Sequence, residues 1–224
     1  MEFYYPKYFL KKLILISLIP YESYKKGLPF LLLLFFLNLN SQSISYEIVG
    51  GVNVSNLKLS VNHNGDISKW NRDSRTSFFL GGGIEFPVKI AKSNKFSLNI
   101  QLQYSQQGNF VEDFNNENNF DEINQINLPV RIKAELFDNL FIGLGGYFGY
   151  LVFVDDYLYE DENNYSNFDS GALVSIEYKL YKKISIEAKY LVGLTDVLNR
   201  EYNNGEYKHN RFNRVFQIGL NYKI

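Results

Sequence analysis

The chain lacks cysteine altogether, and it contains only one methionine, one tryptophan and two histidines in 224 residues. Without cysteine it has no disulfide framework, no zinc–thiolate site, no thiol nucleophile and no cysteine-linked lipid anchor. Neither a nucleophile-elbow motif nor a metalloprotease helix motif is present. The formal net charge of -1 gives no bulk attraction to nucleic acid. We therefore expect no enzymatic activity, no cofactor, no bound metal and no nucleic-acid partner.

A helical hydrophobic period is also missing from residue 43 onward, and a period of two takes its place. In the last segment, 214–224, apolar Phe216, Ile218, Leu220, Tyr222 and Ile224 alternate with polar residues or glycine. This alternation is typical of a strand with one apolar and one polar face. An exposed apolar edge strand promotes aggregation, whereas the last strand of a closed barrel pairs with the first. The ending therefore favours a barrel.

Eight segments follow this pattern, although glycine dilutes it in 45–59, 77–90 and 140–154; the other five are 96–105, 125–136, 172–180, 184–192 and 214–224. Each has about the 9–11 residues that a tilted strand needs to cross a bilayer. The connections alternate between long (60–76, 108–123, 155–169, 196–211) and short (92–95, 137–139, 181–183). The predicted fold is all-β: an eight-stranded antiparallel up-and-down transmembrane β-barrel with short periplasmic turns and long extracellular loops.

Alternation alone does not separate a membrane barrel from a soluble lipocalin-like barrel, which places its apolar residues inside. Aromatic residues near the strand ends favour the membrane, because such rings prefer the lipid–water boundary. The expected loop-side set is Phe78, Tyr104, Phe148, Tyr150, Tyr190 and Phe212, and the expected turn-side set is Tyr46, Phe86, Phe96, Phe137, Tyr178 and Tyr222. We therefore predict residence in the outer membrane and keep a soluble ligand-binding barrel as an alternative.

Residues 1–42 differ in composition from the rest of the chain. Lys25 and Lys26 precede an apolar run from Leu28 to Leu39 that is too short for a membrane-spanning helix and suits the core of a signal peptide. The positive region is preceded by an unusually long leader. We assign 1–42 to a signal peptide, with a membrane-anchored N-terminal helix as the alternative, and 43–224 to the barrel domain.

Several motifs resemble the small outer-membrane β-barrel proteins of the PorT-like type. They are Ile126–Ile132, Gly145–Leu151, Tyr190–Thr195 and the terminal strand. The terminal strand is similar to the signal read by the barrel-insertion machinery, carried by Gln217, Gly219, Tyr222 and Ile224, with isoleucine where phenylalanine is more usual. The resemblance implies a barrel over 43–224 and a possible link to a secretion apparatus.

The interior of an eight-stranded barrel is just wide enough for side chains to fill. The charged residues expected to point inward are Glu85, Lys89, Arg131, Lys133, Glu135, Glu177, Lys179, Glu187 and Lys189. Buried charges must be paired, and pairs such as Glu177 with Lys189 or Lys179 with Glu187 fit neighbouring strands. We expect a salt-bridged plug and a structural or interaction role for a monomer, with a small porin as the alternative.

The connections hold the remaining candidates. His63 and His209 would meet if the last strand pairs with the first, giving a weak candidate for metal or acid–base chemistry. The acidic run Asp155–Glu162 lacks the spacing of an EF-hand and reads as a solvated loop. Basic residues in the first and fourth long loops could contact lipopolysaccharide phosphates: Lys69, Arg72, Arg75, Lys208, Arg211 and Arg214.

Overall fold

The computed structural model describes residues 44–63, 66–70, 73–90, 93–112, 118–155, 165–198, 200–202 and 207–224. These residues form ten strands: β1 (Ser45–His63), β2 (Asp66–Trp70), β3 (Asp73–Ile90), β4 (Ser93–Glu112), β5 (Asn118–Phe137), β6 (Leu140–Asp155), β7 (Phe168–Tyr181), β8 (Ile184–Gly193), β9 (Arg200–Tyr202) and β10 (Tyr207–Lys223). The described part of the chain contains no helix long and apolar enough to cross a membrane. The expected signal peptide, 1–42, lies outside the described residues.

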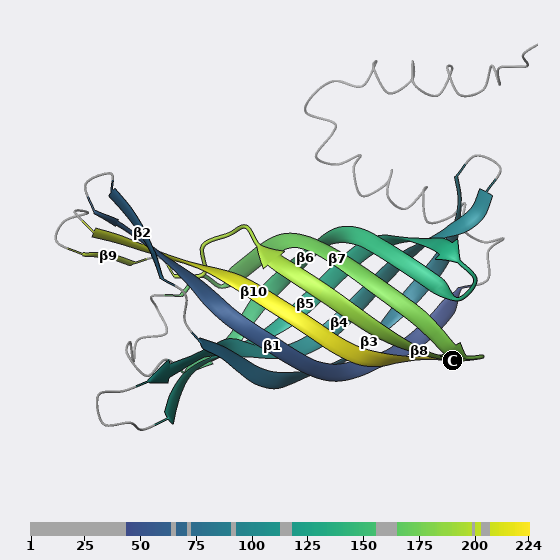
Figure 1. Ribbon diagram of the computed structural model, residues 1–224, viewed down its shortest axis with the longest axis horizontal. Helices are drawn as coiled ribbons and strands as arrows, with labels where there is room; N and C mark the ends of the chain where they lie inside the picture. Colours follow the sequence, from purple (N-terminus) through teal and green to yellow (C-terminus); the bar gives the residue numbers. More distant parts are fainter. Residues whose placement is uncertain are drawn as a thin grey trace, which may run out of the picture. The chain divides into compact units, whose positions relative to one another are not determined.

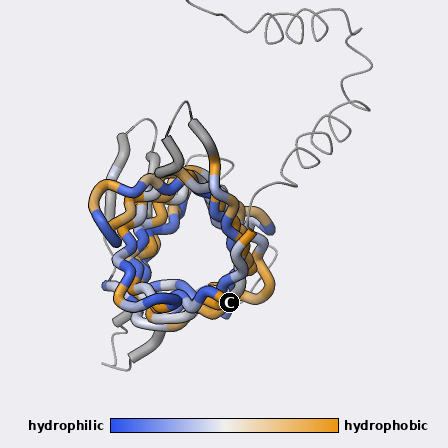
Figure 2. Tube along the Cα trace, turned by 90° about the vertical axis from the view of Figure 1, so that its right-hand side faces the viewer, coloured by the Kyte–Doolittle hydropathy of each residue, from blue (hydrophilic) through white to orange (hydrophobic). Residues whose placement is uncertain are grey.

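The strands form one antiparallel sheet that closes on itself (Figures 1 and 2). Its order is β1-β3-β4-β5-β6-β7-β8-β10, and β10 pairs with β1 from Glu47 opposite Lys223 to His63 opposite Tyr207. The short strands β2 and β9 extend the sheet at the outer edges of β1 and β10. The barrel therefore has eight strands in its wall, and the fold predicted from the sequence is confirmed.

The strands are longer than the sequence suggested. Parts of the predicted loops 60–76, 108–123 and 196–211 continue as paired strand: β1 runs to His63, β4 runs to Glu112 and β10 begins at Tyr207. The prediction of irregular loops there was wrong, because asparagine-rich segments without an apolar face still pair through their backbones when a neighbouring strand continues beside them.

Two tight turns and the carboxyl terminus define one end of the barrel, called here the turn end. Asp138 and Asn139 connect β5 to β6, and Lys182 and Lys183 connect β7 to β8, as the sequence predicted. Asn139 adopts a φ of 70°, a conformation that asparagine tolerates better than most residues. The opposite end, the loop end, carries β2 and β9 (Figure 1).

The outer face of the wall is apolar and the inner face is largely polar. Exposed side chains include Ile48, Leu80, Leu102, Leu144, Val174, Ile176, Ile218 and Leu220, whereas Gln101, Asn127, Arg131 and Glu187 are at most 1% exposed. A lipocalin-like barrel would show the reverse. The alternative of a soluble ligand-binding barrel is therefore wrong.

The aromatic residues expected at the boundaries mostly point outward. Phe78, Tyr150 and Tyr190 are exposed toward the loop end, and Phe137 and Tyr222 are exposed toward the turn end. Phe86 differs from this expectation, because it is buried with 5% exposure.

Candidate functional site in the barrel lumen

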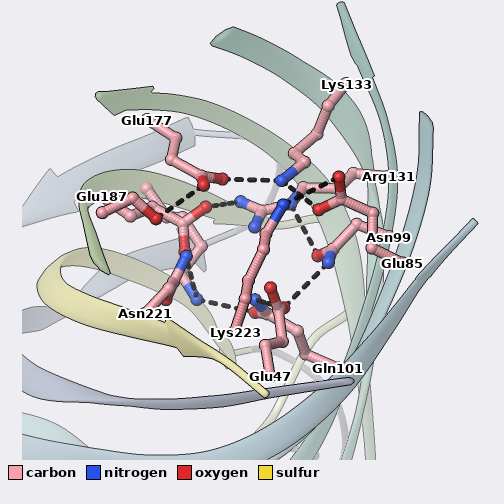
Figure 3. A network of polar contacts seen from close by, with 12 residues as sticks. Glu47, Glu85, Asn99, Gln101, Arg131, Lys133, Glu177, Glu187, Asn221 and Lys223 are labelled. Carbon is pink, nitrogen blue, oxygen red and sulfur yellow. Dashed lines mark hydrogen bonds and ion pairs between the residues drawn. The ribbon is translucent and has the colours of Figure 1, made fainter. Parts of the chain in front are cut away.

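The half of the lumen nearer the turn end contains a network of buried charges (Figure 3). Because side chains alternate along a strand, the odd-numbered residues Arg131 and Lys133 of β5, Glu177 of β7, and Glu187 and Lys189 of β8 all point inward. The guanidinium of Arg131 on β5 forms an ion pair with the carboxylate of Glu187 on β8, and its Nε donates to Asn99 Oδ1 at 3.0 Å. Both charged side chains are at most 1% exposed.

Lys133 links its own strand, β5, to β3 and β7. Its Nζ lies 2.7 Å from Glu177 Oε2 on β7 and 2.5 Å from Glu85 Oε2 on β3. Glu85 also pairs with Lys223 of β10 at 3.0 Å, and Glu177 accepts a hydrogen bond from Ser185 Oγ at 2.7 Å. The ammonium is therefore held between two carboxylates on a side chain that is 1% exposed, and ion pairs are stronger in such a buried position than at a surface.

Lys189 crosses the lumen. Its Nζ donates to Gln101 Oε1 at 3.0 Å, and β8 and β4 are four strands apart in the eight-stranded ring. The same ammonium lies 3.6 Å from Glu187 and 4.8 Å from the centre of the Phe79 ring. Gln101 and Asn99 both donate to Glu47 Oε1, at 2.6 and 2.8 Å. Side chains therefore connect strands on opposite sides of the barrel.

Inward glycines make room for this filling. A Cβ atom at Gly219 would lie 2.6 Å from the Phe79 ring, and one at Gly83 would lie 3.0 Å from Glu47 Oε1. An eight-stranded barrel is narrow, so large interior side chains require small residues on facing strands. Gly219, and Gly83 among the glycines that diluted the alternation in 77–90, thus serve interior packing.

Of the interior charges predicted from the sequence, six lie buried in the network: Glu85, Arg131, Lys133, Glu177, Glu187 and Lys189. Glu135 is only half-buried and Lys179 is exposed, because both lie close to the turn end. The side chain of Lys89 lies outside the described residues. Sequence reasoning missed Glu47 and Lys223, although alternation in β1 and β10 placed both on the inner face.

The partners predicted for these charges were wrong. The register sets Glu177 opposite Glu187, and Lys189 opposite Ser175. Glu177 binds Lys133 instead, and Glu187 binds Arg131. The charges of Glu47, Glu85, Glu177 and Glu187 are nevertheless matched by Arg131, Lys133, Lys189 and Lys223, so the network is formally neutral.

Toward the loop end the interior becomes more apolar. Tyr147, Leu173, Leu191 and Val215 form a buried cluster on the wall made by β6, β7, β8 and β10. Beside it, the buried carboxylate of Asp169 accepts hydrogen bonds from Tyr147 Oη at 2.9 Å, Asn213 Nδ2 at 2.6 Å and Thr195 Oγ1 at 2.9 Å.

A second apolar cluster closes the interior beyond this level, made by Leu57, Ile123, Val154, Tyr165, Val197 and Leu198. Three of these residues belong to segments between strands, which fold inward against the wall. Arg211 on β10 donates to Tyr165 Oη at 2.8 Å and lies 3.4 Å from Asp121 on β5, again four strands away in the ring. The lumen is therefore bridged at two levels.

This position contradicts the expectation that Arg211 faces lipopolysaccharide, because Arg211 is inside the barrel and 1% exposed. The guanidinium of Arg214 donates to the carbonyls of Gly193 and Asn213, and Arg75 pairs with Glu122 at 2.5 Å. Arg72 and the side chains of Lys69 and Lys208 lie outside the described residues.

The two histidines are placed by their backbones, and their side chains lie outside the described residues. Val61 pairs with His209 and His63 with Tyr207, so the two histidines lie on neighbouring strands, two register positions apart. Within the described ranges, no group of three or more His, Cys, Asp or Glu residues could hold a metal ion. Most of the acidic run after Asp155 lies outside those ranges.

The residues of the expected insertion signal lie on the terminal strand, with Gln217 and Gly219 buried inside, and Tyr222 and Ile224 exposed outside. The amide nitrogen of Ile224 donates to the Tyr46 carbonyl at 2.9 Å.

Residues 40–199 match the family model of the outer membrane protein beta-barrel domain. Three solved structures illustrate the similarity of fold. The Neisserial surface protein A structure is 12% identical with a TM-score of 0.49, covering 81% of this chain and 99% of that one. The outer membrane protein OprG from Pseudomonas aeruginosa is 15% identical, with a TM-score of 0.41 and coverage of 82% and 97%. The attachment invasion locus protein Ail of Yersinia pestis is 13% identical, with a TM-score of 0.40 and coverage of 81% and 99%. No match was found among curated protein sequences.

Proposed function

Because the chain belongs to the family of outer membrane protein beta-barrel domains, we propose that it serves the outer membrane as a closed barrel with a structural or interaction role rather than as a pore. Its apolar outer face meets lipid. The family hosts several roles on one architecture, so the role must be argued from the lumen and the loop end.

The observation that carries the proposal is the hydrogen bond between Lys189 and Gln101 across the full width of the ring. The ion pairs of Arg131 and Lys133 occupy the same half of the lumen (Figure 3). An ion crossing this level would have to displace buried, charge-assisted contacts that each exclude water, which opposes steady conduction. The ion pair between Arg211 and Asp121, nearer the loop end, opposes ion conduction at a second level of the lumen.

The loop end offers the surface for an interaction role. The paired strands β2-β1-β10-β9 project there beyond the rest of the wall (Figure 1). Since outer-membrane barrels place short turns in the periplasm, this end would face the cell exterior and the lipopolysaccharide layer. We propose that a monomer displays these strands, after insertion guided by Gln217, Gly219, Tyr222 and Ile224. A link to a secretion apparatus is supported by the resemblance to the PorT-like type alone.

Solute entry into proteoliposomes tests the proposal. The full chain, extracted from the outer membrane and reconstituted, should give no more entry of a small sugar than protein-free liposomes. The double variant Gln101→Ala/Lys189→Ala removes the bridge and should raise entry measurably. The control Lys179→Ala, at an exposed position near the turn end, should leave entry unchanged. Rapid entry through the unaltered protein would refute the plug and support the small porin.

A further inference from the structure

An inward row crosses three strands in the loop-end half of the lumen. Asn127 on β5 pairs with Gly149 on β6, and Gly149 pairs with Asp169 on β7. Asn127 and Asp169 are at most 2% exposed. Gly149, in the middle of this row, has no side chain. The side chains of Asn127 and Asp169 therefore border a common space on the inner side of Gly149.

Two amide oxygens point at this space. The position of a Cβ atom built on Gly149 lies 2.7 Å from Asn127 Oδ1, 3.1 Å from Gln125 Oε1 and 3.4 Å from Asp169 Cβ. Both amide oxygens are buried, and neither has a hydrogen-bond partner. Buried acceptors without partners are uncommon and costly, so their convergence on one point requires an explanation.

The hydroxyl donors near this space are already used, whereas the amide donor Asn127 Nδ2 is buried without a partner. Tyr147 Oη and Thr195 Oγ1 both donate to the Asp169 carboxylate, as does Asn213 Nδ2. The other end of the Asn213 amide, Oδ1, is buried without a partner as well. Three hydrogen bonds leave lone-pair capacity on the carboxylate. The described residues thus offer two unpartnered amide oxygens, a carboxylate and one unpartnered amide donor, Asn127 Nδ2, and the hydroxyls of Tyr147 and Thr195 are engaged with the carboxylate.

We propose that Asp169, Asn127 and Gln125 form a binding site for a hard, oxygen-preferring cation of the calcium class, seated over Gly149. Calcium takes carboxylate oxygens and Asn or Gln carbonyl oxygens together and tolerates irregular geometry. The cation would satisfy both amide oxygens and balance the Asp169 carboxylate. The site is separate from the charge network of the turn-end half and does not depend on whether the barrel conducts.

Calcium alone is the probe. The full chain, extracted in detergent and treated with a chelator, is titrated with Ca²⁺ by calorimetry, and the temperature at which the barrel unfolds is followed by its gel mobility. The unaltered protein should bind one Ca²⁺ saturably and unfold at a higher temperature with the ion present. Gly149→Ala fills the site at the cost of moving two flexible amide ends only.

Gly149→Ala and Asn127→Leu should each weaken Ca²⁺ binding by about ten-fold or more, as expected when a metal site loses its arrangement. The matched control is Gly82→Ala, where the nearest atom to the new Cβ is the Glu47 carbonyl oxygen at 3.4 Å. It should bind as the unaltered protein does. If Gly149→Ala does not fold, Asn127→Leu decides. Absence of saturable binding, or equal affinity in the variants, would overturn the site.

Discussion

At the scale of the residue, Glu187 joins three other buried side chains in the lumen. Its carboxylate pairs with Arg131, lies 3.6 Å from Lys189 Nζ and accepts a hydrogen bond from Asn221 Nδ2 at 3.2 Å. All of these side chains are buried. Removing one partner of a buried pair leaves the other charge without compensation, which costs more than the pair itself contributes.

Glu187→Gln should therefore lower the free energy of unfolding by about 3–5 kcal/mol, because the buried guanidinium of Arg131 loses its carboxylate partner. Urea titration of the barrel in lipid vesicles measures this difference. The matched change Glu135→Gln, at a half-buried position near the turn end, should stay within about 0.5 kcal/mol of the unaltered protein. Equal stability of the two variants would show that the buried contacts of Glu187 do not stabilise the barrel.

At the scale of the element, the pairing of β3 with β4 is interrupted toward the loop end. Their register breaks between Ser74 and Phe79, close to Gly108 with a φ of 132°. Side chains replace the missing backbone bonds: Asn53 Nδ2 donates to the carbonyls of Phe78 and Gln106 at 3.0 and 2.6 Å, and Ser55 Oγ donates to the carbonyl of Gly108 at 3.0 Å. A neighbouring strand, β1, thereby holds the seam closed.

Asn53→Ala should open this seam, because two carbonyls lose their donor. We expect a loss of about 1–3 kcal/mol in unfolding free energy. Hydrogen–deuterium exchange should become faster in β3 and β4 around the bulge, while β7 and β8, whose pairing does not involve Asn53, keep their protection. Uniformly faster exchange in all strands would contradict a local role for Asn53.

The wall could be predicted from the sequence because alternation fixes which residues face inward, as it did for Arg131, Lys133 and Glu187. The contacts of these side chains across the lumen could not be predicted. They depend on the shear of the barrel, which is the stagger in register that accumulates around its strands. Gln101 meets Lys189 only when β4 and β8 stand opposite each other at the right height. Arg211 was assigned to a loop because its neighbours are polar, and only the continued pairing of β10 with β1 carries it inside.

At the scale of the whole molecule, the barrel has an apolar outer face and a charged interior. A charged substitution on the outer face should therefore lower the free energy of unfolding more in the middle of a strand than at its end. Val174 lies among the exposed apolar residues in the middle of β7, and Tyr181 is exposed at the end of the same strand. A charge facing the middle of the bilayer must lose its water, whereas a charge at the boundary keeps it.

Val174→Arg should lower folding stability in a bilayer by about 2–4 kcal/mol, and Tyr181→Arg by about 0–1 kcal/mol. Equilibrium folding into lipid vesicles measures both. If the two variants were equally stable, the outer face of β7 would not meet the hydrocarbon core.

The central claim is that this outer-membrane barrel is closed to ions by its own side chains. Single-channel recording on the unaltered protein in a planar bilayer tests it most directly, with folded insertion verified by the change of gel mobility on boiling. The closed lumen predicts a silent baseline after insertion, interrupted at most by brief openings. Steady conductance steps that scale with salt concentration would contradict the bridges of Lys189 to Gln101 and Arg211 to Asp121 as barriers.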